Sequence, residues 1–321
     1  MKKITTGIAA LLLCFWLLPQ SVCAAKLLVP GGQVIGIVLE DDTVTVAAFD
    51  EELGKTCKAA GLKVGDRLLS VNGKAVTSAQ EVRDILSRCD GQVELVVLRG
   101  DQQKQFRLQP EATAQGPRLG LFLRQGITGV GTVTWYDPDT GDFGALGHGV
   151  NTAGGQLVQM TKGNVYTAGI FSVKKGKSGA PGQLVGSLSG EAPIGTLSKN
   201  TRQGVFGNAK NPWSGQELPV AEPEDVKVGP ATIRSTVGSN LQEYSVEILK
   251  IYPNDKAAGR NMLLRITDPA LLEATGGIVQ GMSGSPIIQD GKLVGAVTHV
   301  LVNDPTTGYG IFIENMLDAA A

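Results

Sequence analysis

Short runs of alternating apolar and polar residues fill the chain from residue 118 to its end. Segments such as GITGVGTVTWYD and KLVGAVTHVLV carry apolar residues at alternate positions, which is the pattern of strands with one buried face. Turn-forming sequences separate these runs, as in DPD at 137–139 and YPND at 252–255. Helical periodicity is limited mostly to DPALLEATG. This part of the chain therefore predicts a β-barrel or a pair of barrels.

Residues 33–110 show a more compact pattern. The stretch QVIGIVLEDDTVTVAAF predicts two strands around its acidic centre, and Asn72-Gly73 predicts a tight hairpin, because type I′ turns need positive φ at both central positions. The segment SAQEVRDILSRC gathers its apolar residues on one helical face, with Ser78 and Glu81 spaced as in a capping box. A hairpin, QVELVVLRGDQQKQFRLQP, closes the module.

This module resembles a PDZ domain, most clearly in AAGLKVGDRLLSVNGKAV and the amphipathic helix after it. The resemblance implies that Ile35, Gly36 and Ile37 belong to the loop whose N–H groups hold a peptide carboxylate. A peptide C-terminus or internal segment would then add as a strand to the adjacent edge. The helix over residues 78–89 would line the apolar pocket. The sequence also allows a PDZ fold that serves only as a spacer.

The first 25 residues differ from the rest. Lys2 and Lys3 precede an apolar run, and the segment ends in the small residues of QSVCAAK, as in a secretory signal. The run is short for a membrane-spanning helix, although an uncleaved anchor is an open alternative. We therefore expect an exported protein with a signal peptide or anchor at 1–25. A PDZ domain at 33–110, a linker at 111–117 and a peptidase-type domain at 118–321 would follow.

Composition excludes some functions. The 321 residues include 29 basic and 30 acidic side chains, a formal charge of −1, so nothing favours binding to nucleic acid. Outside the N-terminal segment the cysteines are Cys57 and Cys89, which lack C-x-x-C spacing and a nearby histidine. They predict no zinc site, and either one disulfide or two small buried side chains. We expect neither a metal nor an organic cofactor.

The sequence GMSGSP near the C-terminus is the strongest candidate for chemistry. Two apolar runs flank Gly281-Met282-Ser283-Gly284, and the pattern G-x-S-G-x-P is typical of the nucleophile loop of chymotrypsin-like proteases. There the N–H groups of the serine and of the glycine two residues before it form an oxyanion hole, each donor being worth about 2.7–4 kcal/mol in the transition state. Ser283 is thus the predicted nucleophile, with Gly281 and Ser283 as oxyanion donors.

Two other serines compete with Ser283. GKSGAP places Ser178 in the same G-x-S-G-x-P pattern, but three lysines lie around it, which indicates a solvated turn. Ser285 lies beside Pro286 and lacks the preceding spacing. The sequence favours Ser283 because apolar strands flank it.

A serine hydroxyl needs a base, and the chain has two histidines. His148 lies in the glycine-rich GDFGALGHGV, so its ring is uncrowded by its neighbours. His299 lies in an alternating strand shortly after Ser283, where a structural role is more common. We favour His148 as the base and keep His299 as the alternative.

An acidic residue is expected to orient the base. Asp268 in LLRITDPALL lies at a predicted strand end before a proline. Asp142, Asp290 and Asp304 compete with it, and Asp290 is more plausible as a turn residue in QDGK. The residues alone leave this choice open.

The whole chain resembles the SpoIVB serine peptidase family. The resemblance rests on an exported N-terminus, a PDZ domain, FGALGHG, and GIVQGMSGSPIIQDGKLVGAVTHVLVNDPTTGYGIFIE. It places the family's catalytic residues on His148, Asp268 and Ser283. The fold it implies is mainly β, a PDZ domain followed by a chymotrypsin-like β-barrel peptidase domain.

The family also implies a biological role. Such a peptidase would be exported from the forespore into the space between the two membranes, cut its own chain and a membrane-bound regulator, and so trigger activation of a late sigma factor. The PDZ domain would control self-recognition and partner choice. The competing interpretation is a secreted PDZ scaffold without catalytic activity.

Overall fold

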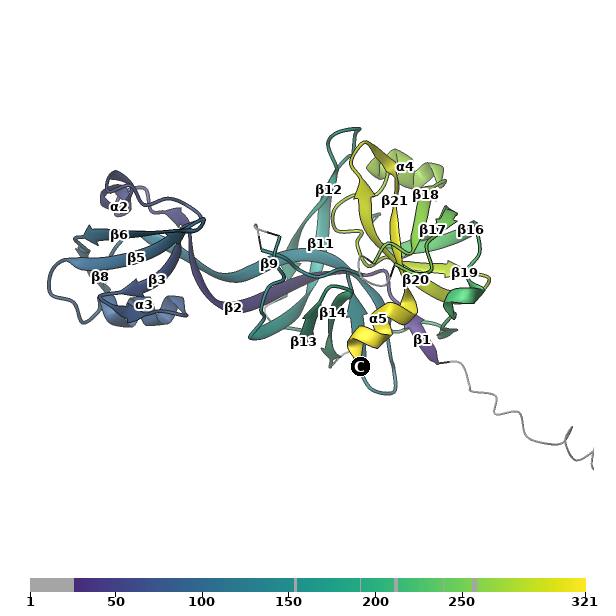
Figure 1. Ribbon diagram of the computed structural model, residues 1–321, viewed down its shortest axis with the longest axis horizontal. Helices are drawn as coiled ribbons and strands as arrows, with labels where there is room; N and C mark the ends of the chain where they lie inside the picture. Colours follow the sequence, from purple (N-terminus) through teal and green to yellow (C-terminus); the bar gives the residue numbers. More distant parts are fainter. Residues whose placement is uncertain (1–25, 153–154, 191, 211–212, 239, 256–258) are drawn as a thin grey trace, which may run out of the picture.

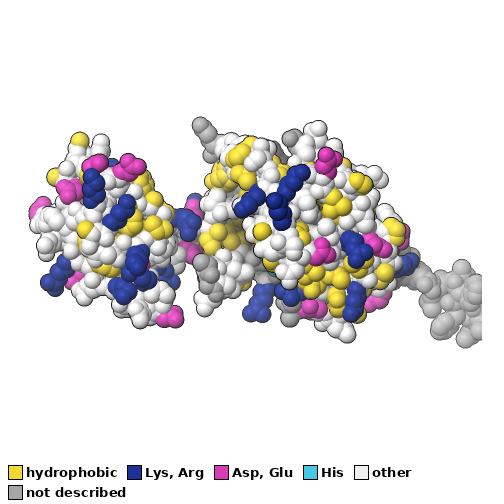
Figure 2. Space-filling model, turned by 90° about the horizontal axis from the view of Figure 1, so that it is seen from above, with side chains coloured by type: hydrophobic (Ala, Val, Ile, Leu, Met, Phe, Trp, Pro, Cys, Tyr) yellow, Lys and Arg dark blue, Asp and Glu magenta, His cyan; other side chains and the backbone are white. Residues whose placement is uncertain are grey.

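The computed structural model describes residues 26–321 except 153–154, 191, 211–212, 239 and 256–258. The predicted signal segment at 1–25 therefore lies outside the described residues. Two bodies are joined by a narrow neck (Figures 1 and 2), along which the paired strands β2 (Val34–Phe49) and β9 (Leu121–Tyr136) run. In the part of the chain that the structure describes, no helix has the length and apolarity to cross a membrane.

The larger body contains two barrels. In the first, β2 pairs with β9 on one side and with β11 on the other, which closes a ring of strands. In order of pairing, the strands of this ring are β2 (Val34–Phe49), β9 (Leu121–Tyr136), β10 (Asp142–Ala145), β14 (Gly204–Ala209), β13 (Gly195–Thr201) and β11 (Lys162–Lys174). Short flanking strands extend the sheet: β1 (Leu27–Pro30), β15 (Leu218–Pro219) and β12 (Gln183–Ser189).

The second barrel is closed by pairing of its first strand with its fourth in chain order. Its strands in pairing order are β16 (Gly229–Ser235), β17 (Gln242–Ile251), β18 (Met262–Ile266), β21 (Asp304–Phe312), β20 (Lys292–Leu301) and β19 (Pro286–Gln289). Three helical segments accompany it: η1 (Pro223–Asp225), α4 (Pro269–Thr275) and α5 (Ile313–Ala320). Each barrel has its own apolar core. The expected mainly β fold with a β-barrel domain is confirmed.

The smaller body is the PDZ domain. Its core is a separate apolar cluster that runs from Val44 to Leu119, with Leu121 and Leu123 packed against it. Its elements between β2 and β9 are α2 (Lys55–Ala59), β3 (Arg67–Val71), β4 (Lys74–Ala75), α3 (Ala79–Leu86), β5 (Val93–Arg99), β6 (Gln102–Leu108), β7 (Glu111–Thr113) and β8 (Gly116–Arg118). As predicted, Ser78 caps α3 by accepting the N–H of Glu81 at 3.2 Å.

The expected domain boundaries are wrong in one respect. The first half of β2 pairs with β9 and β11 inside the first barrel, whereas its second half pairs with β3 in the PDZ domain. The PDZ domain is therefore an insertion between two strands of the first barrel and does not precede it. Residues 111–117, expected as a linker, form most of the β7–β8 hairpin of the PDZ domain. Sequence patterns missed this because β2 is one unbroken run shared by both bodies.

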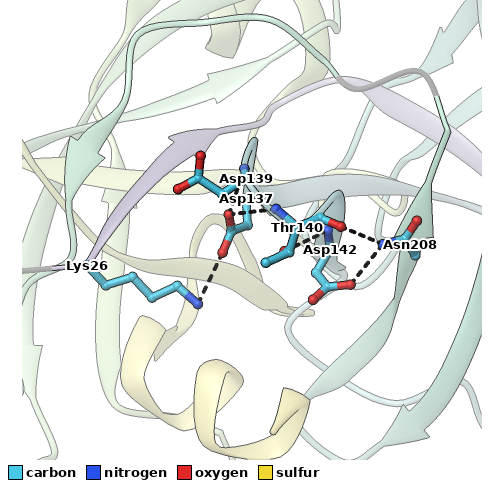
Figure 3. Close-up of polar contacts among 6 residues, drawn as sticks. All are labelled: Lys26, Asp137, Asp139, Thr140, Asp142 and Asn208. Carbon is cyan, nitrogen blue, oxygen red and sulfur yellow. Dashed lines mark hydrogen bonds and ion pairs between the residues drawn. The ribbon is translucent and has the colours of Figure 1, made fainter.

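A polar network fixes the turn between β9 and β10 (Figure 3). Asp137 accepts the backbone N–H of Asp139 at 3.1 Å, and its other oxygen lies 3.4 Å from the ammonium of Lys26. Asn208 on β14 donates to Asp142 at 3.0 Å. The network ties the start of the described chain and β14 to the strand pair that leads to His148.

Candidate active site

A cavity of ≈ 680 Å³ lies between the two barrels. The first barrel contributes His148 and apolar residues of β2 and β9, and the second contributes Ser283 and the residues around it. The structure thus brings together the predicted nucleophile and the predicted base, which lie far apart in the sequence. His299 lines the same cavity.

The nucleophile loop is shaped by its own hydrogen bonds. The carbonyl of Gln280 accepts the N–H of Leu184 at 2.8 Å, and the carbonyl of Met282 accepts the N–H of Ser285 at 2.9 Å. In a trans peptide the N–H points opposite to the C=O, so these bonds fix the directions of the Gly281 and Ser283 N–H groups. Neither N–H has an acceptor among the described residues. Both N–H groups are therefore available as oxyanion donors, and both residues line the cavity.

Glycine is required in this loop. Gly284 has φ +96°, and a Cβ there would lie 2.0 Å from the carbonyl oxygen of Thr132. Gly281 has φ +100°, which an L side chain rarely adopts. The spacing of glycines around Ser283 is thus set by backbone geometry.

Ser283 Oγ donates a hydrogen bond to the carbonyl of Thr298 at 2.8 Å. Its proton is therefore directed at the backbone of β20 in this structure. Transfer of this proton to a histidine therefore requires the hydroxyl to leave its bond with Thr298.

His148 follows β10 on a sharp bend, where Leu146 has φ +72°. Its Nδ1 lies 2.9 Å from the carbonyl oxygen of Gly149. A carbonyl only accepts, so Nδ1 carries the proton and Nε2 keeps its lone pair. Burial lowers the pKa of His148, and the bond to Gly149 partly offsets that effect. The ring is thus neutral near pH 7, as a general base must be.

Asn200 on β13 holds the loop that follows His148. Its side-chain oxygen accepts the N–H of Val150 at 2.9 Å, and its amide donates to the carbonyls of Val150 and Val158 at 2.9 and 3.0 Å. Sequence reasoning missed this residue. An asparagine in a polar strand end carries no signal of its role until the opposite loop is in place.

His299 lies beside the base. The two imidazole centroids are 5.1 Å apart, with the rings inclined by 39°. The pKa of His299 is lowered mainly by desolvation, and further by the charges of His148 and Arg260. The residue is nevertheless exposed at its position on β20. Both histidines therefore line the cavity between the barrels as neutral rings at neutral pH.

The expectation that Asp268 orients His148 is not met in this structure. Asp268 is the N-cap of α4: one carboxylate oxygen accepts the N–H groups of Ala270 and Leu271, each at 3.0 Å. The other oxygen accepts the N–H of Ser245 at 3.3 Å. The physical reason is local, because an aspartate before a proline at a helix start satisfies N–H groups that the helix leaves unpaired.

The competing aspartates are also engaged in turns. Asp142 bonds to Asn208, and Asp304 accepts the hydroxyls of Thr306 and Thr307 at 2.7 Å each. Asp290 has φ +50° in its turn, as the QDGK pattern predicts.

The competing serines do not line the cavity. Ser178 is exposed and donates to the carbonyl of Asn303 at 2.9 Å. Ser285 is fully buried, and its hydroxyl has no partner among the described residues. The choice of Ser283 over both agrees with this placement.

The predicted peptide-binding residues of the PDZ domain are wrong. Ile35, Gly36 and Ile37 lie in β2, paired on one side with β9 and on the other with β11. Ile35 and Ile37 are buried in the core of the first barrel. A strand with both edges paired cannot accept another strand, and these residues are not part of the PDZ domain.

The groove of the PDZ domain lies instead between α3 and the start of β9. This cavity of ≈ 620 Å³ is lined by Val82 and Leu86 of the helix and by residues 115–123. Gly120, with φ +62°, makes the bend that leads into β9. The signal that could have located it is Leu119-Gly120-Leu121, an apolar–glycine–apolar run directly before an alternating strand.

Within the described residues, no group of three or more His, Cys, Asp or Glu side chains could hold a metal ion. Cys57 and Cys89 are both free thiols in the PDZ domain, and burial raises the pKa of Cys57 to about 11.

Two barrels around a cavity that holds a serine and a histidine, with an inserted PDZ domain, define the architecture of a serine peptidase. The family model of SpoIVB peptidase S55 matches residues 115–317, and the PDZ domain model matches residues 58–99. The chain therefore belongs to the SpoIVB peptidase S55 family.

Other similarities are partial. Two Helicobacter pylori proteins named "Putative zinc metalloprotease" are 36% and 39% identical over 63 and 62 residues, and the chain spans 18% of the length of each. The PDZ domain of the SdrC-like protein from Listeria monocytogenes shares 24% identity, with 26% of this chain and 87% of that chain covered and a TM-score of 0.23. The active form of Rv3671c protease from M. tuberculosis shares 16% identity, with 60% and 73% covered and a TM-score of 0.37.

Proposed function

We propose that Ser283 is the nucleophile and His148 the general base of this peptidase. The observation that carries the proposal is their joint placement on one cavity with the unengaged N–H groups of Gly281 and Ser283. Its alternative, a scaffold in which GMSGSP is only a turn, gives no reason for two backbone donors beside a cavity to be left without acceptors.

The reaction follows from these positions. Nε2 of His148 takes the proton of Ser283 as Oγ attacks the carbonyl carbon of the scissile bond, and the two N–H groups stabilise the resulting oxyanion. The C–N bond then breaks, and His148 gives its proton to the leaving amine. Water hydrolyses the acyl-enzyme by the same route, which restores the Ser283 hydroxyl.

The test is covalent labelling by a fluorophosphonate, followed by mapping of the modified peptide. We expect the label on Ser283 and its loss in Ser283→Ala. Ser285→Ala is the matched control, because it removes a hydroxyl two residues away that is buried and off the cavity. Label that persists in Ser283→Ala would overturn the proposal.

We further propose that the protein acts in intercompartmental sporulation signalling. It would be exported by residues 1–25, act between the forespore and mother-cell membranes, cleave itself and cleave a membrane-bound regulator. Membership of the SpoIVB family and the basic-apolar pattern of residues 1–25 support this. Self-cleavage is tested by mass spectrometry of the purified chain over time, and an equal rate in Ser283→Ala would exclude it. Export is tested by fusing residues 1–25 to a reporter enzyme that is active only outside the cytoplasm.

The PDZ groove supports a second proposal, the binding of an extended peptide. One edge of β9 pairs with β2, and the groove lies between β9 and α3, so a peptide can add as a strand there. Phe122 lines the groove and is 56% exposed. Phe122→Asp should weaken binding of peptides from the chain's own cleavage products, measured by fluorescence polarisation. Val64→Asp is the control, since Val64 is 61% exposed on the same domain but outside the groove.

A further inference from the structure

Thr132 is a fully buried threonine on β9 that touches the nucleophile loop twice. Its hydroxyl donates to the carbonyl of Gly281 at 2.7 Å, and its backbone N–H donates to the carbonyl of Ser283 at 3.0 Å. The two accepting carbonyls lie on either side of Met282. One residue of the first barrel therefore forms hydrogen bonds to both ends of the segment that carries the nucleophile in the second barrel.

These contacts bear on the oxyanion donors. The Gly281 carbonyl belongs to the peptide that follows the Gly281 N–H, and glycine at φ +100° has little steric resistance to rotation. The hydroxyl of Thr132 supplies a restraint that the glycine itself lacks. With that bond, the peptides before and after Gly281 are both held. The N–H of Leu184 holds the first, and Thr132 holds the second together with the bond from the Met282 N–H to the carbonyl of Val279 at 3.1 Å.

Thr132 also sets the base relative to the nucleophile. Its carbonyl accepts the N–H of Leu146 at 3.1 Å, two residues before His148. The Gly284 backbone passes so close to Thr132 and Leu146 that a Cβ on Gly284 would lie within 2.5 Å of both. Thr132 thus forms hydrogen bonds to both the loop that carries Ser283 and the loop that carries His148.

We propose that Thr132 is a positioning residue for the oxyanion hole, acting through the hydrogen bond from its hydroxyl to Gly281. The inference rests on the proposed role of Ser283 as the nucleophile. Thr134 provides a matched comparison, because its buried hydroxyl donates to the carbonyl of Gly284 at 2.8 Å from the same strand. That bond restrains a peptide beyond the two oxyanion donors.

The experiment measures fluorophosphonate labelling of the full chain, separating the maximal rate of labelling from the reagent's apparent affinity. Thr132→Val keeps the shape and removes the hydroxyl, so the maximal rate should fall about 10–100-fold, less than for loss of a donor itself, with affinity unchanged. Thr132→Ser should restore the rate to within about threefold, since it keeps the donor. Thr134→Val should lower the melting temperature similarly but the rate by less than about threefold.

Three results are decisive. Equal rates in Thr132→Val and the wild type, or equal losses in Thr132→Val and Thr134→Val, would overturn the role of Thr132 while leaving the nucleophile intact. Label that survives in Ser283→Ala would instead overturn the proposed function. Should Thr132→Val fail to fold, Thr132→Cys takes its place: a thiol is a weak donor, so an intermediate rate supports the proposal and a wild-type rate opposes it.

Discussion

Leu39 lies opposite Ile127 in the β2–β9 ladder, although the whole PDZ domain lies between them in the chain. Because paired positions of an antiparallel ladder can be joined by a two-residue turn, the PDZ domain can be removed at this point without opening the first barrel. Replacing residues 40–126 by Asn-Gly should leave a folded peptidase that still labels with fluorophosphonate.

A chain that begins at residue 118 is the contrasting variant. It lacks β1 and β2, so the first barrel loses two pairings of β2 and cannot close. We expect no cooperative thermal unfolding and no labelling from it. Labelling of that shorter chain would show that the peptidase domain folds and reacts without β2.

Asp268 is expected to act on stability. Asp268→Ala removes the cap of α4 and should cost about 1 kcal/mol in the free energy of unfolding, measured by denaturant titration. Asp268→Asn keeps an oxygen that can accept the N–H groups of Ala270 and Leu271, so it should cost less, and labelling should stay within about threefold for both. A loss of roughly 10⁴-fold in Asp268→Asn, the size expected for a triad aspartate, would mean that this carboxylate reaches His148 in the active state.

The two histidines are separable by substitution. His148→Ala should reduce labelling by at least about 10²-fold, because it removes the base that faces the cavity with a free Nε2. His299→Ala should reduce it by less than about tenfold, since His299 lines the cavity from the strand that already carries the acceptor of Ser283. The reverse order of effects would assign the base to His299.

The pH dependence follows from the lowered pKa of His148. A base must be unprotonated, so labelling should be retained at the ordinary histidine value of 6.5 and fall only as pH decreases through the lower pKa of the folded protein. Between these two pH values the unfolded chain binds the proton more readily than the folded one. Stability should therefore decrease as pH falls below 6.5. Rates and melting temperatures from pH 8 to 5 check both, with His148→Gln as the control that removes its share of the stability change. If the labelling rate already decreases while the pH is still above 7, the assignment of His148 as the base is contradicted.

Gly284→Ala should be strongly destabilising. The added Cβ would meet the carbonyl oxygen of Thr132 at 2.0 Å at a φ of +96°, and backbone cannot move aside as a side-chain tip can. We expect a loss of more than about 3 kcal/mol. Gly291→Ala has a similar positive φ but open space around the Cβ, so it should cost about 1–2 kcal/mol. Equal costs, measured by thermal or denaturant unfolding, would show that the contact with Thr132 is not limiting.

The sequence predicted the PDZ domain, the β-rich peptidase domain and the pairing of His148 with Ser283. These features depend on local patterns: alternation of apolar residues, glycines beside a hydroxyl or imidazole, and turn chemistry. Each such pattern depends on only a few neighbouring residues, so it can be recognised from the sequence alone. Asp268 shows their limit, since an aspartate before a proline at a helix start has the same local appearance as an acid at a strand end.

Only the tertiary structure showed that β2 is shared by two domains and where along it the barrel gives way to the PDZ domain. For that reason only the structure could place Ile35, Gly36 and Ile37 in a barrel and not in a peptide-binding loop. It also placed Thr132 against the nucleophile loop and Asn200 against the base loop. Both decisions depend on hydrogen bonds between segments distant in the sequence. An edge that is paired and an edge that is free have the same alternating sequence, so only the position of the neighbouring strand distinguishes them.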